Sequence, residues 1–218
     1  IQAAAHVAQR LLGDRQALIA TGLLGGFVSS TATIATLGTQ ARTQAPPLQR
    51  RLAGAASLSG AATWLQALAL AAVVGPALLP QMLPMALAGA GVASLAGAWS
   101  SMARDSDPLA AAPSKPQRPL RLREALLVAA VLLGVSIAVA WLRNRYGTQG
   151  LLTGSAVAAL ADAHAPIAAA LGLYGQGTVD AREALITVLV AIGANSASRS
   201  VASFVTGGSG YGVRVSST

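Results

Sequence analysis

The chain has 218 residues, of which 54% are hydrophobic and only 10% are charged. Soluble domains carry about 25% charged residues, so this sequence has too few charges to cover a water-facing surface and is predicted to be an integral membrane protein. The net charge is +8, and the basic residues lie mostly between the apolar runs. This placement favours contact with anionic lipid headgroups and argues against nucleic-acid binding. No cysteine is present, which excludes disulfides, thiol catalysis and cysteine-based metal sites.

Six apolar runs of membrane-spanning length follow one another along the chain. A helix needs about 20 mostly apolar residues to cross a bilayer. A basic, proline-rich loop at residues 104–123 divides the runs three and three. We therefore predict an all-α fold, a transmembrane helix bundle of about six spans that forms a single membrane domain over residues 1–218. The predicted spans are residues 17–38, 52–78, 83–102, 125–142, 151–173 and 184–206.

Small residues and hydroxyls gather in the first span, in the stretch GLLGGFVSSTATIATLG. Four-residue spacing places them on two neighbouring helix faces. These faces are Gly22, Gly26 and Ser30, and Gly25, Ser29 and Thr33. Such ladders let another helix approach closely and let hydroxyls bond across the contact, which predicts a helix-packing face. In the alternative, Gly25 and Gly26 loosen the helix, so that carbonyls and hydroxyls line a path for an ion or solute.

The fifth predicted span carries two ionisable residues in the stretch ALADAHAPIAAA. Asp162 lies about 16 Å from the start of that span, close to the middle of a hydrocarbon core of about 30 Å. A carboxylate at this depth costs several kcal/mol unless it is paired or hydrated. Pro166 cannot donate to the carbonyl of Asp162 and is expected to bend the helix, which would let Asp162 and His164 serve one cavity. In the alternative, His164 only bonds a neighbouring helix.

The sixth predicted span contains the stretch IGANSASRS, in which Asn195 and Arg199 share a helix face. Arg199 is expected either to extend toward the nearer membrane surface or to pair with Asp162, directly or through water. Gln66 in the second span is a weaker polar candidate. Because spans one, five and six carry polar groups near the same depth, we predict one shared polar site inside the bundle.

Three motifs in this order resemble the C-terminal membrane domain of MgtC/SapB-family bacterial proteins. They are GLLGGFVSSTATIATLG, ADAHAPIAAALGL and ANSASRSVASFVTGGSGYGVRV. The resemblance covers about residues 17–215 and implies a multi-pass protein of the bacterial inner membrane with no firmly attached activity. By position, the family's polar signature falls on Ser29, Ser30, Thr31, Thr33, Asp162, His164, Asn195 and Arg199. Arg199 stands where the family more often has Lys, which keeps the charge but not the ability to lose a proton.

Transport of a small ion or polar solute is the function that these residues favour. Asp162 would bind a cation or proton, His164 would relay it, and hydroxyls of the first span would coordinate it; an anion would instead bind Arg199. The alternative is a non-transporting interaction module that binds another membrane protein or a second copy of itself through small-residue faces. An enzyme is not expected, because no HExxH or serine-nucleophile motif occurs. The expected partners are membrane lipid and the transported species, with no cofactor and no defined metal ligands.

Overall fold

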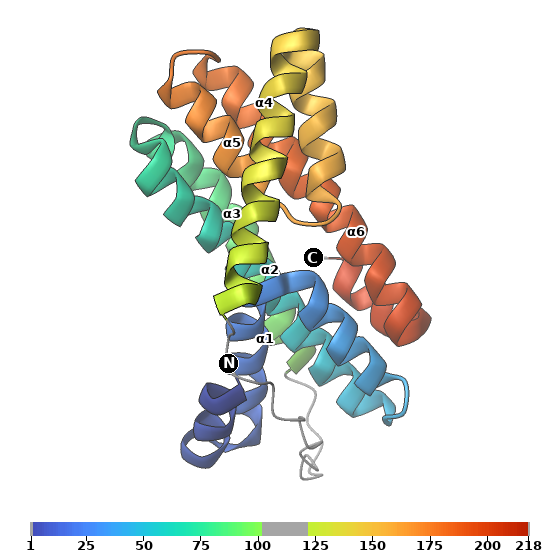
Figure 1. The fold of residues 1–218 in the computed structure, drawn as a ribbon. Helices are drawn as coiled ribbons and strands as arrows, with labels where there is room; N and C mark the ends of the chain where they lie inside the picture. The colour runs from blue at the N-terminus through green and yellow to red at the C-terminus, as the bar shows by residue number, and fades with distance from the viewer. Residues whose placement is uncertain (1, 102–121, 218) are drawn as a thin grey trace. The chain divides into compact units, whose positions relative to one another are not determined.

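The computed structural model of the chain describes residues 2–101 and 122–217, so most of the predicted loop at 104–123 lies outside the described residues. Helices account for the secondary structure of this part of the chain (Figure 1), which contains no strand. They are α1 (Gln2–Ala41), α2 (Pro46–Val74), the short 3-10 helix η1 (Pro76–Leu78), α3 (Leu79–Ser101), α4 (Leu122–Ala159), α5 (His164–Gly175) and α6 (Ala181–Ser216). The predicted all-α class is confirmed.

Four of the described helical segments are long and apolar enough to cross a membrane. They are Leu18–Ala41, Pro46–Val74, Pro76–Ser100 and Ala181–Ser216. These segments support a membrane protein, but they do not confirm the predicted number of about six spans. The predicted spans at residues 125–142 and 151–173 are not among the four. For residues 151–173 the reason lies in how α4 and α5 fold.

Helix α4 consists of two arms, because the chain reverses direction at Gly147. This glycine has φ +62° and ψ −146°, a conformation that residues with a Cβ rarely adopt. Residues 122–146 form the first arm and residues 148–159 the second. The arms pack closely, since a Cβ at Gly150 would collide with the carbonyl oxygen of Leu142.

The predicted fifth span is not one continuous helix. Its first part lies in the second arm of α4, residues 160–163 then break the helix, and α5 packs against α4. Arg143, before the Gly147 reversal, donates to Glu183 at 3.1 Å and to the carbonyl of Thr178 at 3.2 Å, both after α5. The chain therefore enters and leaves this segment at the same end.

Residues 148–175 thus form a helical hairpin, whose tip is the non-helical stretch 160–163 (Figure 1). We call it the re-entrant hairpin, because the chain enters and leaves it at the same end. Each of its two helices has 12 residues and is about 18 Å long, which is too short to cross a hydrocarbon core of about 30 Å. Hydropathy alone could not separate this hairpin from a span, because an apolar run of the right total length has the same composition whether it continues or turns back.

The described chain packs as two compact units, each of which is considered by itself. The first unit comprises the described residues of 1–65, 87–117 and 199–218, and the second those of 66–86 and 118–198. In the first unit, α1 and α2 approach closely through small residues. A Cβ at Gly22 would collide with the carbonyl oxygen of Ala55, and one at Gly26 would lie 2.7 Å from the Cα of Ser59.

Helix α6 ends in a second reversal, at Gly208, which has φ +77° and ψ −179°. The reversal turns Tyr211 into the core of the first unit, where its hydroxyl donates to the carbonyl of Ile34 at 2.8 Å. Tyr211 and Ile34 are fully buried there. Other members of this core are Leu37, Ala41, Leu52, Ala53, Ala55, Ala56 and Val215.

Candidate functional site

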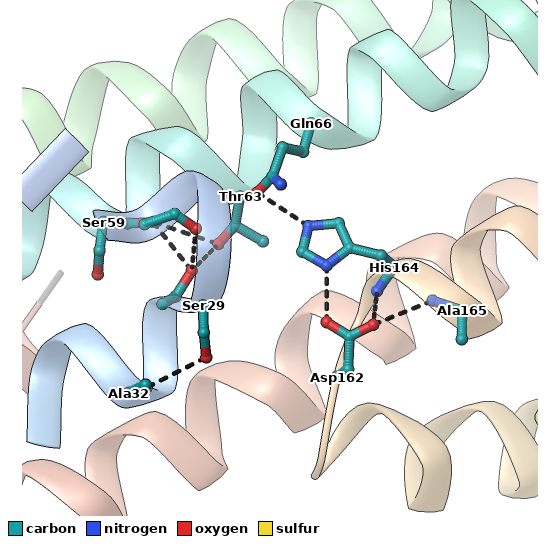
Figure 2. Close-up of polar contacts among 10 residues, drawn as sticks. Ser29, Ala32, Ser59, Thr63, Gln66, Asp162, His164 and Ala165 are labelled. Carbon is teal, nitrogen blue, oxygen red and sulfur yellow. Dashed lines mark hydrogen bonds and ion pairs between the residues drawn. The ribbon is translucent and has the colours of Figure 1, made fainter. Parts of the chain in front are cut away.

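The tip of the re-entrant hairpin, in the second unit, is organised around the carboxylate of Asp162 (Figure 2). Its Oδ2 accepts the backbone N–H groups of His164 at 3.2 Å and Ala165 at 3.4 Å. These are the orphan donors of the first turn of α5, so Asp162 caps that helix. Pro166 follows within the same turn and has no N–H to satisfy. The proline therefore begins a new helix, whereas the sequence analysis expected it to bend a continuing one.

The imidazole of His164 bridges Asp162 and helix α2 (Figure 2). Its Nδ1–H donates to Asp162 Oδ1 at 2.6 Å, and its Nε2 lies 2.9 Å from Gln66 Oε1. A carboxylate and an amide oxygen both accept hydrogen bonds, so the ring donates to one of them when it is neutral and can donate to both when it is protonated. The side chains of Asp162 and His164 are 43% and 25% exposed, so the protein does not enclose this pair.

Helix α6 holds the tip through a hydroxyl. Ser198 donates from Oγ to the carbonyl of Leu160 at 2.7 Å, which satisfies an acceptor in the turn that follows α4. Asn195, three residues earlier on α6, is buried in the second unit. The tip is therefore fixed by side chains from α2 and α6 as well as by its own cap.

In the first unit, the central hydroxyls of α1 and α2 meet. Ser30 Oγ lies 2.8 Å from Thr63 Oγ1 and donates to the carbonyl of Ser59 at 3.2 Å. Ser30 is twelve residues after Leu18 and eleven before Ala41 in its candidate span, so the contact lies near mid-span. Ser29 and Thr33 bond within α1 instead, since Thr33 Oγ1 donates to the carbonyl of Ser29 at 2.8 Å. Of the three predicted hydroxyls, only Ser30 has a described bond to another helix.

Arg199 is buried in the first unit, with 8% of its surface exposed. Its Nη2 donates to Ser59 Oγ at 3.1 Å, and its Nε has no hydrogen-bond partner. Ser59 is thirteen residues from the start of α2 and fifteen from its end, so the guanidinium lies near the middle of that helix and does not extend to a helix end. A Cβ at Gly60 would lie 3.3 Å from Nη2, so the guanidinium packs against the glycine face of α2.

The predicted site residues thus fall into two groups. Asp162, His164 and Asn195 belong to the second unit, whereas Ser29, Ser30, Thr33 and Arg199 belong to the first. Their convergence on one pocket, and the pairing of Asp162 with Arg199, stay predictions. Ser59 and Thr63 are not among the predicted site residues, although their four-residue spacing at the centre of the second apolar run repeats the pattern of the first.

Two other features bear on what the chain can bind. Among the described residues, no group of three or more His, Cys, Asp or Glu side chains could hold a metal ion. A cavity of about 530 Å³ lies along α4 and is lined mostly by apolar residues of its two arms, including Val135, Leu142 and Val157. None of the predicted site residues lines this cavity.

A family model described as "Domain of unknown function (DUF4010)" matches residues 1–207, a range that contains every predicted site residue. No curated protein matches the chain, and no solved structure does either. None of these findings links the chain to the MgtC/SapB family, so that resemblance stays a prediction.

Proposed function

The chain belongs to the DUF4010 family, and from that premise we propose that it is a transport protein that moves a small ion or polar solute through the membrane at the tip of its re-entrant hairpin. The observation that carries the proposal is the half-exposed pair of Asp162 and His164 at a helix break within an apolar fold. At membrane depth, non-helical backbone is tolerated only where it is buried in protein or lines a water-filled cavity. An ionisable pair that the protein does not enclose supports the second case.

In this proposal the charge of the tip changes with the proton on His164. While the ring is protonated, it neutralises Asp162 across the 2.6 Å contact. Loss of the proton leaves the tip with the net negative charge of the carboxylate, which attracts a cation. Gln66 keeps the ring in place as it gains and loses the proton. Asp162 is therefore the binding group and His164 the proton relay.

The alternative role, a non-transporting interaction module, has less support. The face of α1 that carries Gly22 and Gly26 is already covered by α2 of the same chain. Large apolar side chains such as Val73, Leu95 and Trp99 are exposed, which fits contact with lipid tails. The proposal thus has membrane lipid and the transported species as partners and assigns no catalysis. The resemblance to the MgtC/SapB family supports a place in the bacterial inner membrane.

Thiol accessibility tests whether the tip is hydrated. The chain has no cysteine of its own, so an introduced cysteine is the only thiol that can react. Ala161→Cys is introduced at the tip, and Val28→Cys, which is 70% exposed near the middle of the Leu18–Ala41 segment, serves as the lipid-facing control. We expect a membrane-impermeant thiol reagent to label Ala161→Cys in sealed vesicles at least about tenfold faster, since only a hydrated thiol ionises and reacts. Equal rates would overturn a water-filled path to the tip.

Flux measurements test the role of the carboxylate. Proteoliposomes are assayed with radioactive sodium, radioactive rubidium and an entrapped pH-sensitive dye. At least one probe should move faster than in protein-free liposomes, and Asp162→Asn should slow that movement by about tenfold or more, because the site loses its charge. Asp180→Asn is the matched control, since Asp180 caps α6 outside the tip. Flux that survives Asp162→Asn, or no flux of any probe, contradicts the proposal.

A further inference from the structure

The first unit buries a positive charge, and the side chains that the structure describes there include no negative one. Arg199 nevertheless brings its guanidinium to the middle of α2, where 8% of the residue is exposed. A buried charge normally needs a partner of opposite sign, because desolvation is costly. The counter-charge of Arg199 therefore has to come from outside the described side chains of its own unit.

The hydrogen bonds around Arg199 show which of its donors are available. A guanidinium has five N–H donors, and one of them, on Nη2, is taken by Ser59 Oγ at 3.1 Å. The hydroxyl of Ser59 donates in turn to the carbonyl of Ala56 at 2.6 Å, so Ser59 accepts from the guanidinium and positions it. The Nε–H is buried and has no partner. An orphan donor of this kind calls for an acceptor, and a negatively charged acceptor satisfies both the hydrogen bond and the charge.

We infer that Arg199 is the ligand of a small monovalent anion, of the size of chloride or nitrate, which binds inside the first unit through the Nε–H edge of the guanidinium. One buried positive charge matches one negative charge. A Cβ at Gly60 would lie 3.3 Å from Nη2 and 3.4 Å from the Cβ of Ala93, so small residues pack against the Nη side of the guanidinium. The Nε atom is itself buried, so an anion that reaches it has to be small. This inference goes beyond the proposed activity of the hairpin tip and does not depend on it.

Nitrate is a suitable probe, because its planar oxygens match the donor fork of a guanidinium. The full chain, purified in detergent, is titrated with sodium nitrate by calorimetry at constant ionic strength, with sodium gluconate as the large-anion reference. Wild-type protein should bind nitrate and not gluconate. Arg199→Gln should weaken nitrate binding at least about tenfold and Ser59→Ala about threefold, as expected for a lost charged donor and a lost positioning bond.

Arg214→Gln is the matched control. This arginine belongs to the same unit, and its Nη1 donates to the carbonyl of Gly210 on its own helix, so its loss should leave nitrate binding unchanged. If Arg199→Gln does not fold, Arg199→Lys keeps the charge but removes the Nε–H and should still weaken binding, and Ser59→Ala gives an independent reading.

Two outcomes overturn the inference: wild-type protein that binds no nitrate, and a nitrate affinity that Arg199→Gln leaves unchanged. If the wild type binds no nitrate and Asp162→Asn gains that binding, the counter-charge is an internal carboxylate. The titration measures binding and not transport. Nitrate binding without cation flux would therefore support the anion site and contradict only the transport proposal.

Discussion

The polar centre of the first unit and the hairpin tip of the second satisfy buried charge in opposite ways. Around Arg199 the helices are continuous, and hydroxyls such as Ser59 donate to carbonyls of their own helix. No break in a helix there deprives a backbone N–H or C=O group of its helical hydrogen bond. At the tip the helix breaks, and Asp162 and Ser198 take up backbone groups that the break releases. Among the described side chains of its unit Arg199 has no acidic partner, whereas Asp162 at the tip pairs with His164.

This difference teaches that burial and pairing are separate properties of a membrane-embedded charge. Arg199 is 8% exposed and has no acidic partner among the described side chains of its unit, while the Asp162 side chain is 43% exposed and paired. A tightly packed centre of small residues holds its geometry through contacts along whole helices. A tip that is held by a few side-chain hydrogen bonds is more easily rearranged. We therefore expect the first centre to be rigid and the tip to be the part that moves.

The largest effect is expected where the first unit has no spare room. Gly22→Ala adds a methyl group that collides with the backbone carbonyl of Ala55, which no side-chain movement can relieve. We expect the free energy of unfolding to fall by about 2 to 3 kcal/mol, measured from denaturation curves in detergent. Gly91→Ala, on α3 of the same unit, meets nothing within 4 Å and should be neutral or stabilising. Equal effects of the two changes would disprove tight α1–α2 packing.

The second effect concerns the tip. Asp162→Ala removes the cap of α5 and the partner of His164 Nδ1, which should lower the free energy of unfolding by about 2 kcal/mol. Asp162→Asn retains a capping oxygen and should cost less than about 1 kcal/mol. Thermal unfolding in detergent compares the two variants. A large loss in Asp162→Asn would mean that the charge of Asp162, rather than its capping bonds, holds the tip.

The third effect should have the opposite sign. Arg199→Met removes a buried charge that has no acidic partner among the described side chains of its unit, so in gluconate buffer we expect stability to stay the same or to rise by about 1 kcal/mol. The same unfolding assay measures it. A loss as large as that of Asp162→Ala would show that the guanidinium is compensated within the folded chain, and the contrast between the two centres would disappear.

The smallest effect is expected at the hydroxyl contact of α1 with α2. Ser30→Ala removes the bonds to Thr63 and Ser59, while Thr63 keeps its own bond to the Ser59 carbonyl at 3.3 Å. The expected loss of stability is about 1 kcal/mol. Thr39→Ala, an exposed hydroxyl that bonds one turn back on α1, is the control and should change stability by less than about 0.5 kcal/mol. No difference between the two would show that the interhelical bond contributes nothing.

Part of this architecture follows from the sequence alone. Composition and apolar run length predict helices and a membrane setting, and Asp180 together with Glu183 marks the start of α6, where Asp180 Oδ1 accepts the N–H of Glu183 at 2.7 Å. The hairpin could not be predicted from hydropathy, because its reversal depends on the backbone conformation of a single glycine, Gly147. Asp162, His164 and Pro166 were recognisable as anomalies, yet which of them ends a helix and which begins one depends on partners that are distant in sequence, such as Gln66.

The return of the hairpin to its starting end also decides which side of the bilayer each later residue faces. A full crossing at residues 151–173 would put Arg145 and Arg182 on opposite faces of the membrane. A segment that dips in and comes back puts both arginines on the same face, in agreement with the contact of Arg143 with Glu183. Their positive charges then add on a single surface, and the orientation of the whole protein has to be judged from that combined charge.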